Sequence, residues 1–406
     1  MVVGCDAKAF VVVSDRAARP GVLMVTGAYD PEMSGAGLQC RQLIREIRSA
    51  VDCGVLTTVT DPSLPLDDER DGIPVWRVPV DPSRFSSKVR AAWRMCRILW
   101  RTRRRFHILH FHGFSQKTVL AIVIGRCLGK AIVIKLTSVG HDDPMSMRAR
   151  GALANWCYRQ ATMFFGVSPR FAELYREAGL PPQRFCLIPN GVDLARFSPA
   201  SSDARSALRA RVGVPRHAWV TLFVGFFSHE KCPDVLFEAW LPMAQRDPHQ
   251  VLVLVGATRS AYYEVDPALA DGIRSRAADA GVGDRVIWVE RTACIEDYHR
   301  AADVFVLPST REGLPNALLE AMACGTACVA TRLPGVTDRL IDDGREGRLV
   351  PPRDVAALAD ALTALAADAE TARAWGMRAR ARVAQEFSAK AMGAAYVAAY
   401  ARVVTH

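Results

Sequence analysis

The stretch VFVLPSTREGLPNALLEAMACGTACVA, residues 304–330, contains the features that decide the fold class. Its first four residues are apolar and predict a buried strand, a polar loop follows, and Pro315 suits the first turn of a helix. The first amides of a helix have no partner within it and lie at the positive end of its dipole. The sequence therefore predicts an anion site at the start of this helix.

Two glutamates flank this predicted anion site, Glu312 just before the helix and Glu320 about one turn inside it. An ionised carboxylate only accepts hydrogen bonds, so it is unsuited to phosphate and suited to hydroxyl groups. A ribose and a hexose of one ligand would each satisfy one glutamate. The same spacing also fits an ordinary surface helix whose glutamates only complement its dipole.

Short apolar runs alternate with helical stretches on both sides of the quoted stretch, in one series from Gly21 and a second from Trp219. Such alternation is typical of βαβ units with parallel sheets. We therefore predict an α/β protein with two doubly wound, Rossmann-like domains that face each other across a cleft. The predicted boundaries are residues 1–200 for the first domain, with an extension at 1–20, and 215–385 for the second, with a polar linker near 198–217.

The composition supports two hydrophobic cores and favours a cytoplasmic location. The 406 residues are 50% hydrophobic, and no run of about 18 apolar residues occurs, so we expect neither a signal peptide nor a membrane span. Eleven cysteines are scattered without a CxxC pair, which predicts reduced core thiols in a cytoplasmic protein. A formal net charge of +10 favours an anionic surface or an anionic substrate.

The densest positive charge lies in the segment Arg84 to Arg105, which carries nine lysines and arginines and no acidic residue. Such a basic helix could lie on an anionic membrane surface, and we predict a peripheral, salt-sensitive association and no nucleic-acid partner. The alternative is that its apolar residues pack on the first-domain sheet and leave a solvated basic face, and both arrangements can hold at once. The apolar residues form one stripe of Trp93, Cys96 and Trp100, with Ala92, Met95 and Leu99 beside it.

Glu312 and Glu320, within EGLPNALLEAMACGTACVA, resemble the paired-glutamate signature of the retaining glycosyltransferases of family 4, which have the GT-B fold. One such motif is weak evidence, and SGAGLQ lacks the third glycine of a dinucleotide fingerprint, but the set follows the family's order over nearly all of the chain. The other matching segments are SGAGLQ (34–39), LHFHGF (109–114), GVSPRF (166–171), IPNGVDLARFSP (188–199), FVGFFSHEKCPD (223–234) and DYHRAADVFVLPST (297–310).

The resemblance implies that a hexosyl group moves from a nucleoside diphosphate sugar to an acceptor hydroxyl, with retention and without a metal or other cofactor. No DxD triplet occurs, which agrees with metal-independent chemistry. By resemblance, Glu320 binds the donor ribose, Glu312 binds the donor sugar, and Lys231 neutralises the diphosphate, whose departure a fixed ammonium and aligned amides would stabilise. The other implied donor-binding residues are Gly35, Gly37, Gly225, Gly313, Leu314, Pro315 and Asn316.

The chain departs from the family pattern at one strand end. The family commonly has an arginine after the glycine, whereas here Phe226 follows Gly225 and cannot neutralise phosphate. Either Lys231 acts alone or another arginine takes the place of the missing one. Arg259 is the nearest candidate in the sequence. Alternatively, Arg259 is an ordinary exposed loop arginine. The loop at Gly35 and Gly37 would let the backbone approach phosphate and acceptor, or is a plain strand-to-helix turn.

The family usually places one histidine of the first domain near the reacting sugar. His141 is the first candidate and His112 the second, and either could instead be a structural histidine. As in the resembled fold, we expect the C-terminal helix, residues 386–406, to cross back to the first domain through a stripe of Tyr396, Tyr400 and Val403.

The resemblance leaves the acceptor and two rival functions open. Because the family often glycosylates lipid-linked acceptors, we expect a lipid-linked or polysaccharide-precursor glycan as the acceptor, reached at the inner face of the membrane. One rival is a GT-B nucleotide-sugar epimerase, which needs acid and base groups for elimination. The other is a non-catalytic relative that binds a nucleotide sugar or a glycan.

Overall fold

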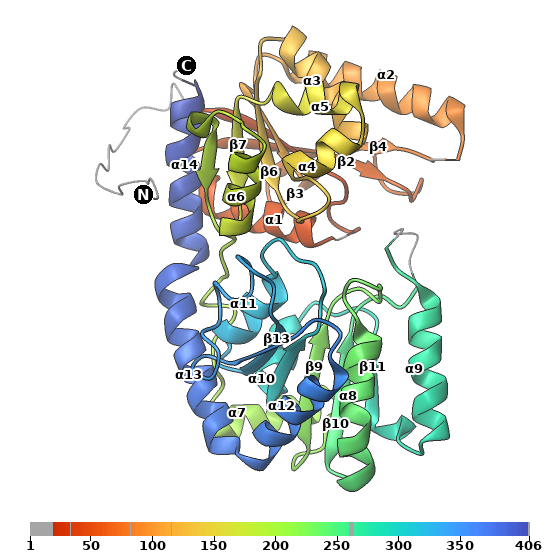
Figure 1. Cartoon of the computed structure of the whole chain (residues 1–406). Coiled ribbons are helices and arrows are strands. Elements are labelled where there is room, and N and C mark those ends of the chain that lie inside the picture. The colour runs from red at the N-terminus through yellow and green to blue at the C-terminus, as the bar shows by residue number, and fades with distance from the viewer. Residues whose placement is uncertain (1–18, 33, 82, 115, 260–263, 405–406) are drawn as a thin grey trace.

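The computed structural model describes residues 19–404 apart from 33, 82, 115 and 260–263, so most of the predicted N-terminal extension lies outside it. Two α/β lobes are stacked, with a long C-terminal helical segment along one side of both (Figure 1). Each lobe is built on a mainly parallel sheet, as the alternating sequence pattern predicts.

The first lobe holds an eight-stranded sheet in the order β3-β4-β2-β1-β5-β6-β7-β8, in which only β3 runs antiparallel. Its strands are β1 Gly21–Thr26, β2 Asp52–Val59, β3 Asp67–Arg70, β4 Ile73–Pro79, β5 Ile108–His112, β6 Ala131–Leu136, β7 Met163–Gly166 and β8 Phe185–Leu187. Its helices are α1 Gly35–Ile47, α2 Phe85–Thr102, α3 Gln116–Cys127, α4 Pro144–Ala149, α5 Ala152–Arg159 and α6 Pro169–Glu177.

The second lobe holds a six-stranded parallel sheet in the order β11-β10-β9-β12-β13-β14. Its strands are β9 Trp219–Val224, β10 Gln250–Val255, β11 Val286–Val289, β12 Val304–Leu307, β13 Ala327–Thr331 and β14 Arg348–Val350. Its helices are α7 Ser202–Arg211, α8 Pro233–Arg246, α9 Pro267–Asp279, α10 Ile295–Ala301, α11 Asn316–Ala323, α12 Val355–Ala367 and α13 Ala369–Glu386, and α14 Ala389–Val404 follows.

Half of the segment predicted as a polar linker is helical, since α7 covers residues 202–211. Helix α7 packs against α10, and its buried Arg209 reaches Asp303 at 2.6 Å and the carbonyl of Ala301 at 3.0 Å. The arginines of this segment therefore hold the helix on the second lobe, and the ordered structure of that lobe begins before residue 215.

The chain passes between the lobes twice, at adjacent places. After β8 it enters the second lobe, and at the end of α13 it returns, where the amide of Val192 donates to Phe387 and the amide of Ala389 donates to Val192, each at 2.9 Å. Gly191 is needed here because a Cβ would lie 2.5 Å from the Cα of Ala389. The two crossings thus form one hydrogen-bonded connection.

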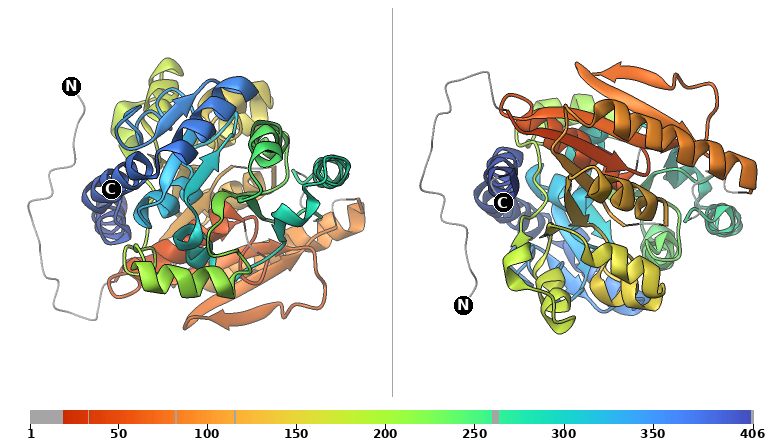
Figure 2. Two further views of the ribbon diagram at one scale, coloured as in Figure 1. Left: turned by 90° about the horizontal axis from the view of Figure 1, so that it is seen from below. Right: turned by 90° about the horizontal axis from the view of Figure 1, so that it is seen from above.

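Helix α14 completes the core of the first lobe. It lies against α1 and β5, and its buried stripe of Met392, Tyr396, Tyr400 and Val403 shares a cluster with strand residues such as Val22. The stripe follows helical spacing, so one face of α14 is buried along its length. Viewed from above, α14 and α2 lie at opposite sides of the lobe (Figure 2).

Helix α2 does not bury the tryptophan stripe. Trp93 and Trp100 are 64% and 57% exposed, whereas Ile98 and Leu99 are buried and Met95 packs against the core beside them. The interpretation that the stripe of Trp93, Cys96 and Trp100 packs on the sheet is therefore wrong. The neighbouring stripe does so instead, because two apolar stripes share this helix and only one can face β4 and α3.

Six of the ten described cysteines are buried. Among the described residues, no helix is both long and apolar enough to cross a membrane.

Candidate functional site

The loops that follow β9 and β12 meet on the side of the second lobe that faces the first. We call this region the cleft, and there Gly313 and Asn316 approach the first lobe. The side-chain ammonium of Lys231, from the first loop, donates to Oε1 of Glu312, from the second, at 2.6 Å. The two loops are also joined through the backbone, where the amide of Thr310 donates to the carbonyl of Glu230 at 2.8 Å. Glu312 is nearly buried and Lys231 is about one quarter exposed, so this ion pair is partly shielded from water. Two of the predicted site residues thus lie together.

Helix α11 begins at Asn316, so Pro315 stands at its N-cap and one residue before the predicted position. Proline has no side-chain group to cap the helix, and the first turn contains no acidic residue. The first amides therefore remain available to an anion. Gly313, just before, approaches the first lobe so closely that a Cβ would lie 2.0 Å from the carbonyl of Thr137.

A second helix start faces α11 from the first lobe. The side-chain amide of Asn316 donates to the carbonyl of Gly35, the first residue of α1, at 3.5 Å. Gly37 has its amide capped by Ser34 at 3.1 Å, and a Cβ there would lie 2.5 Å from the carbonyl of Ala28. Neither helix has an acidic residue in its first turn. Two positive dipole ends therefore point into the same part of the cleft.

The first lobe presents His141 to these loops. His141 lies in the turn between β6 and α4, with Nε2 3.9 Å from Oε1 of Glu230. Burial lowers the pKa of His141, and the Arg311 guanidinium lowers it further. Arg311 contacts both His141 and Glu230. Arg311 directly precedes Glu312 in the chain, but no sequence pattern marks it as part of the site.

Two buried carboxylates shape the turn that carries His141. Asp142 accepts from the amide of Thr137 at 2.8 Å, and Asp143 accepts from the amide of Gly140 at 2.6 Å and caps α4. Burial raises the pKa of Asp142 to about 6, although the hydrogen bonds from Thr137 oppose this shift. This acidic pair therefore belongs to the turn.

Arg259 does not join this group. Its side chain is 68% exposed and pairs with Asp271 of α9 at 2.8 Å. The role that the sequence assigned to Arg259 beside Lys231 therefore finds no support in its position. The strand-end Gly225 lies where β9 meets β10, with its carbonyl 1.9 Å from where a Cβ on Gly256 would lie.

His112 and Glu320 lie apart from the Lys231 and Glu312 pair. His112 is buried at the end of β5, and its ring centroid lies 4.5 Å from that of His110. Burial, followed by the neighbouring His110 and Lys135, holds the pKa of His112 well below its usual range, so it is a neutral core histidine. Glu320 lies on α11 with its Oε2 3.6 Å from Nε2 of the buried His299.

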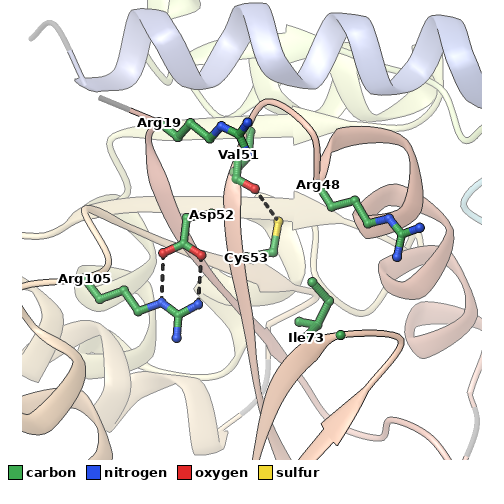
Figure 3. A pocket seen from close by; sticks show the side chains of 8 residues that line it. Arg19, Arg48, Val51, Asp52, Cys53, Ile73 and Arg105 are labelled. Carbon is green, nitrogen blue, oxygen red and sulfur yellow. Dashed lines mark hydrogen bonds and ion pairs between the residues drawn. The ribbon is translucent and has the colours of Figure 1, made fainter. Parts of the chain in front are cut away.

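A separate pocket lies at the amino-terminal ends of strands β1, β2 and β4 of the first sheet (Figure 3). Arg19, Arg48 and Arg105 line it with Asp52. Arg105 forms a two-pronged pair with Asp52, with both distances 2.8 Å, and Arg48 donates to the carbonyl of Asp71. This pocket shares no lining residue with the cleft. Within the described part of the chain, no group of three or more histidines, cysteines or acidic residues is placed to hold a metal ion.

Family models match both lobes of the chain. Residues 34–191 match the model of the glycosyl transferase 4-like domain, and residues 218–368 match that of the glycosyl transferases group 1. The D-inositol 3-phosphate glycosyltransferase of Kineococcus radiotolerans is 37% identical over 244 residues, which are 57% of this chain and 55% of the relative. That of Geodermatophilus obscurus is 37% identical over 56% of this chain and 50% of the relative. The similarity thus spans about half the length of these curated relatives.

Solved structures share the fold over nearly the whole chain. Anabaena HepE in complex with UDP and glucose aligns with a TM-score of 0.76 at 21% identity, over 94% of this chain and 99% of that one. WaaG, a glycosyltransferase involved in lipopolysaccharide biosynthesis, aligns with a TM-score of 0.71 at 17% identity, over 92% and 99%. With both lobes matched by its family models and with this two-lobed fold, the chain belongs to the group 1 glycosyltransferases of family 4, which have the GT-B fold.

Proposed function

We propose that the protein transfers a hexosyl group from a nucleoside diphosphate sugar to an acceptor hydroxyl, with retention of the anomeric configuration. The observation that supports this most is the meeting of Lys231, Glu312 and two helix starts in one part of the cleft. A diphosphate carries negative charge and needs fixed cations and amides, whereas a sugar needs a carboxylate beside them. The cleft supplies both.

In the proposed reaction the diphosphate takes over the ammonium of Lys231, and Glu312 is then free to accept hydrogen bonds from donor-sugar hydroxyls. Negative charge on the diphosphate grows as the glycosidic bond breaks, so Lys231 and the amides at the start of α11 stabilise the transition state most. No nucleophilic side chain stands out among the motifs, so the acceptor oxygen attacks from the face that the diphosphate leaves. A diphosphate oxygen then takes the acceptor proton.

A donor screen with purified protein tests the proposal. UDP-glucose is the first donor to try, because HepE has been solved with it, and D-inositol 3-phosphate belongs in the acceptor panel beside lipid-linked glycans. We expect acceptor-dependent release of nucleoside diphosphate and a product heavier by one hexose in mass spectrometry. Conversion of the donor without acceptor, seen by NMR, would indicate an epimerase instead. Donor binding without hydrolysis or transfer would indicate a non-catalytic relative.

Glu320→Gln is expected to weaken donor binding without unfolding the protein, if this carboxylate accepts hydrogen bonds from the donor ribose. A charge-assisted hydrogen bond is worth roughly 1.5 to 3 kcal/mol, so affinity falls roughly 10- to 100-fold. Calorimetric titration with UDP measures this change. Glu173→Gln, on α6 of the first lobe, is the control and should bind UDP as the wild type does. Equal affinity in the Glu320→Gln variant would remove the ribose assignment.

We also propose that α2 binds the surface of an anionic membrane, and that the acceptor is lipid-linked or a polysaccharide precursor. One face of α2 exposes Phe85, Val89, Trp93 and Trp100, which recur at intervals of four or seven residues. The guanidinium of Arg103 lies 4.0 Å from the ring centre of Trp100, so cations border the exposed rings. Exposed aromatic side chains bordered by cations suit the interface between lipid headgroups and acyl chains. Helix α2 also lies on the outer side of the first lobe, away from the second (Figure 1).

Co-sedimentation with anionic phospholipid vesicles at low and high salt tests this surface. Each basic residue near such a surface contributes roughly 1 kcal/mol, so changing Arg101, Arg103 and Arg104 to serine should weaken binding about 100-fold or more at low salt. Arg105 is left intact because it pairs with Asp52.

Changing Trp93 and Trp100 to serine should remove the part of the binding that persists at high salt. Trp156→Ser, at an exposed tryptophan of α5, is the matched control and should bind as the wild type does. The proposal fails if the wild type ignores anionic vesicles at low salt, or if neither set of changes alters binding.

A further inference from the structure

The cleft contains a second pair of charges beside Lys231 and Glu312. Glu230 precedes Lys231 and Arg311 precedes Glu312, and the carboxylate of Glu230 accepts a hydrogen bond from the Arg311 guanidinium. Two neighbouring ion pairs therefore join the two loops. The loop after β9 supplies the cation of one pair and the carboxylate of the other. The Lys231 pair lies within the second lobe only. The Arg311 guanidinium reaches across the cleft and also contacts His141 of the first lobe.

The chemistry of the two side chains fixes the form of His141 in this contact. A guanidinium has five N–H donors and no acceptor, so Nε2 of His141 must accept the hydrogen bond. An imidazole nitrogen that accepts carries no proton, and the proton of the neutral ring is then on Nδ1. Among the described residues no hydrogen bond to Nδ1 of His141 is present, and the side chain is 28% exposed. The Nδ1–H group is thus available to a ligand in the cleft.

The position of His141 is set by its surroundings and not by the arginine alone. The carboxylates of Asp142 and Asp143 accept hydrogen bonds from backbone amides of the turn. These amides belong to Thr137, Ser138 and Gly140. A Cβ on Gly140 would lie 3.3 Å from Cδ of Arg311, and φ of Gly140 is +81°, so the turn is shaped to admit the arginine. Arg311 therefore approaches a turn that is held by its own hydrogen bonds.

We infer that Arg311 is a positioning residue, which holds His141 across the cleft in the neutral form with its proton on Nδ1, so that this N–H donates to the reacting sugar. The inference rests on the proposed function for the identity of the ligand, but the contact and the tautomer do not depend on it. This chain has Phe226 where the family commonly has an arginine. Arg311 brings an arginine into the cleft, although we infer that it acts on His141.

The charges around His141 give the contact a pH dependence. Burial and the cations Arg311 and Arg150 lower its pKa, whereas Glu230 and Glu264 raise it. Because the shift is downward, the neutral ring persists to a pH below the usual range of histidine, and the contact is lost as pH falls through this lowered pKa. In Arg311→Gln, a cation that lowers the pKa of His141 is gone and the carboxylate of Glu230 remains. The pKa of His141 therefore rises, and the neutral ring forms only at a higher pH.

The first experiment reads the ring directly, without turnover. In ¹⁵N-histidine-labelled full-length protein, the signals of His141 are those that disappear in His141→Asn. Long-range ¹H–¹⁵N correlation distinguishes the two neutral tautomers. We expect the Nδ1–H tautomer and a depressed titration midpoint in the wild type, and a mixture with a raised midpoint in Arg311→Gln. Arg259→Gln, an arginine paired outside the cleft, is the control and should leave His141 unchanged. An Nε2–H tautomer in the wild type, or identical titrations in the wild type and Arg311→Gln, would overturn the inference.

The second experiment uses turnover of the donor found in the screen. Arg311→Gln should lower kcat about tenfold or more, with a smaller change in KM, and should move the acid limb of the rate profile to higher pH. Arg311→Lys should recover part of the rate, because an ammonium can also donate to Nε2. The loss should be no greater in the Arg311→Gln and His141→Asn double variant than in His141→Asn alone. Additive losses would overturn the inference while leaving the proposed function intact, and a wild type that neither binds UDP nor turns over any donor would overturn the proposed function alone.

Discussion

Lys231→Ala should lower kcat about 100-fold or more while changing donor affinity much less. The ammonium is fixed beside Glu312 and near the start of α11, where the proposed diphosphate gains charge only as the glycosidic bond breaks. Loss of one preorganised electrostatic group of this kind typically costs about 100- to 1,000-fold in rate. Steady-state kinetics over a range of donor concentrations separates kcat from KM, and calorimetry with UDP gives the affinity.

Two variants make this result interpretable. Arg259→Ala, at the other basic candidate in the sequence, should keep nearly the full rate because its side chain points to Asp271. Adding Glu312→Gln to Lys231→Ala removes the carboxylate that the first change leaves without its cation. This double variant should not recover the rate. A Lys231→Ala enzyme at nearly wild-type rate would show that the charge comes from elsewhere, and a slow Arg259→Ala enzyme would name the source.

Tyr400→Ala should destabilise the first lobe by about 3 to 5 kcal/mol, the range for removal of a buried aromatic side chain. The ring is fully buried between α14 and the sheet, with its hydroxyl 2.7 Å from Nδ1 of His110. The change leaves a cavity and a buried histidine nitrogen without its partner. Denaturant unfolding followed by tryptophan fluorescence and by circular dichroism measures the loss.

Tyr400→Phe is the matched control, since it keeps the ring and removes only the hydroxyl. It should cost about 1 kcal/mol, the usual net value of one hydrogen bond. If the alanine variant unfolds at the wild-type denaturant concentration, α14 is not part of the first core in solution. Equal costs for the two variants would instead assign the whole effect to the hydrogen bond with His110.

The fold class could be predicted from the sequence because it depends on local patterns. Buried strands such as Val304–Leu307 are continuous apolar runs, and the intervening stretches have helical character. The contact between Lys231 and Glu312 was accessible through the family resemblance and through the rule that strand ends of a parallel sheet share one edge. Both signals lie within a few residues of the side chains concerned.

What the sequence could not predict depends on partners that are distant in the chain. The sequence around helix α7 reads as polar because the partner of Arg209, Asp303, lies 94 residues away. His112 is buried beside His110, whose partner Tyr400 lies on α14, far along the chain. On α2 the helical period defines two apolar stripes but not which of them faces the sheet. Arg311 was passed over because its partner His141 comes from the other lobe.

The docking of α14 on the first lobe has a consequence for synthesis on the ribosome. The strands and α1 that form the partner surface of α14 are translated early, yet the sixteen residues that cover this surface follow only after the whole second lobe. Domains usually fold in the order in which they emerge, the N-terminal one first. Here the nascent first lobe must carry an uncovered apolar face, which includes the ring of Phe165 that packs against Tyr396, while the whole second lobe is translated. Binding of a chaperone to this face during translation, ended by the docking of α14, is therefore expected.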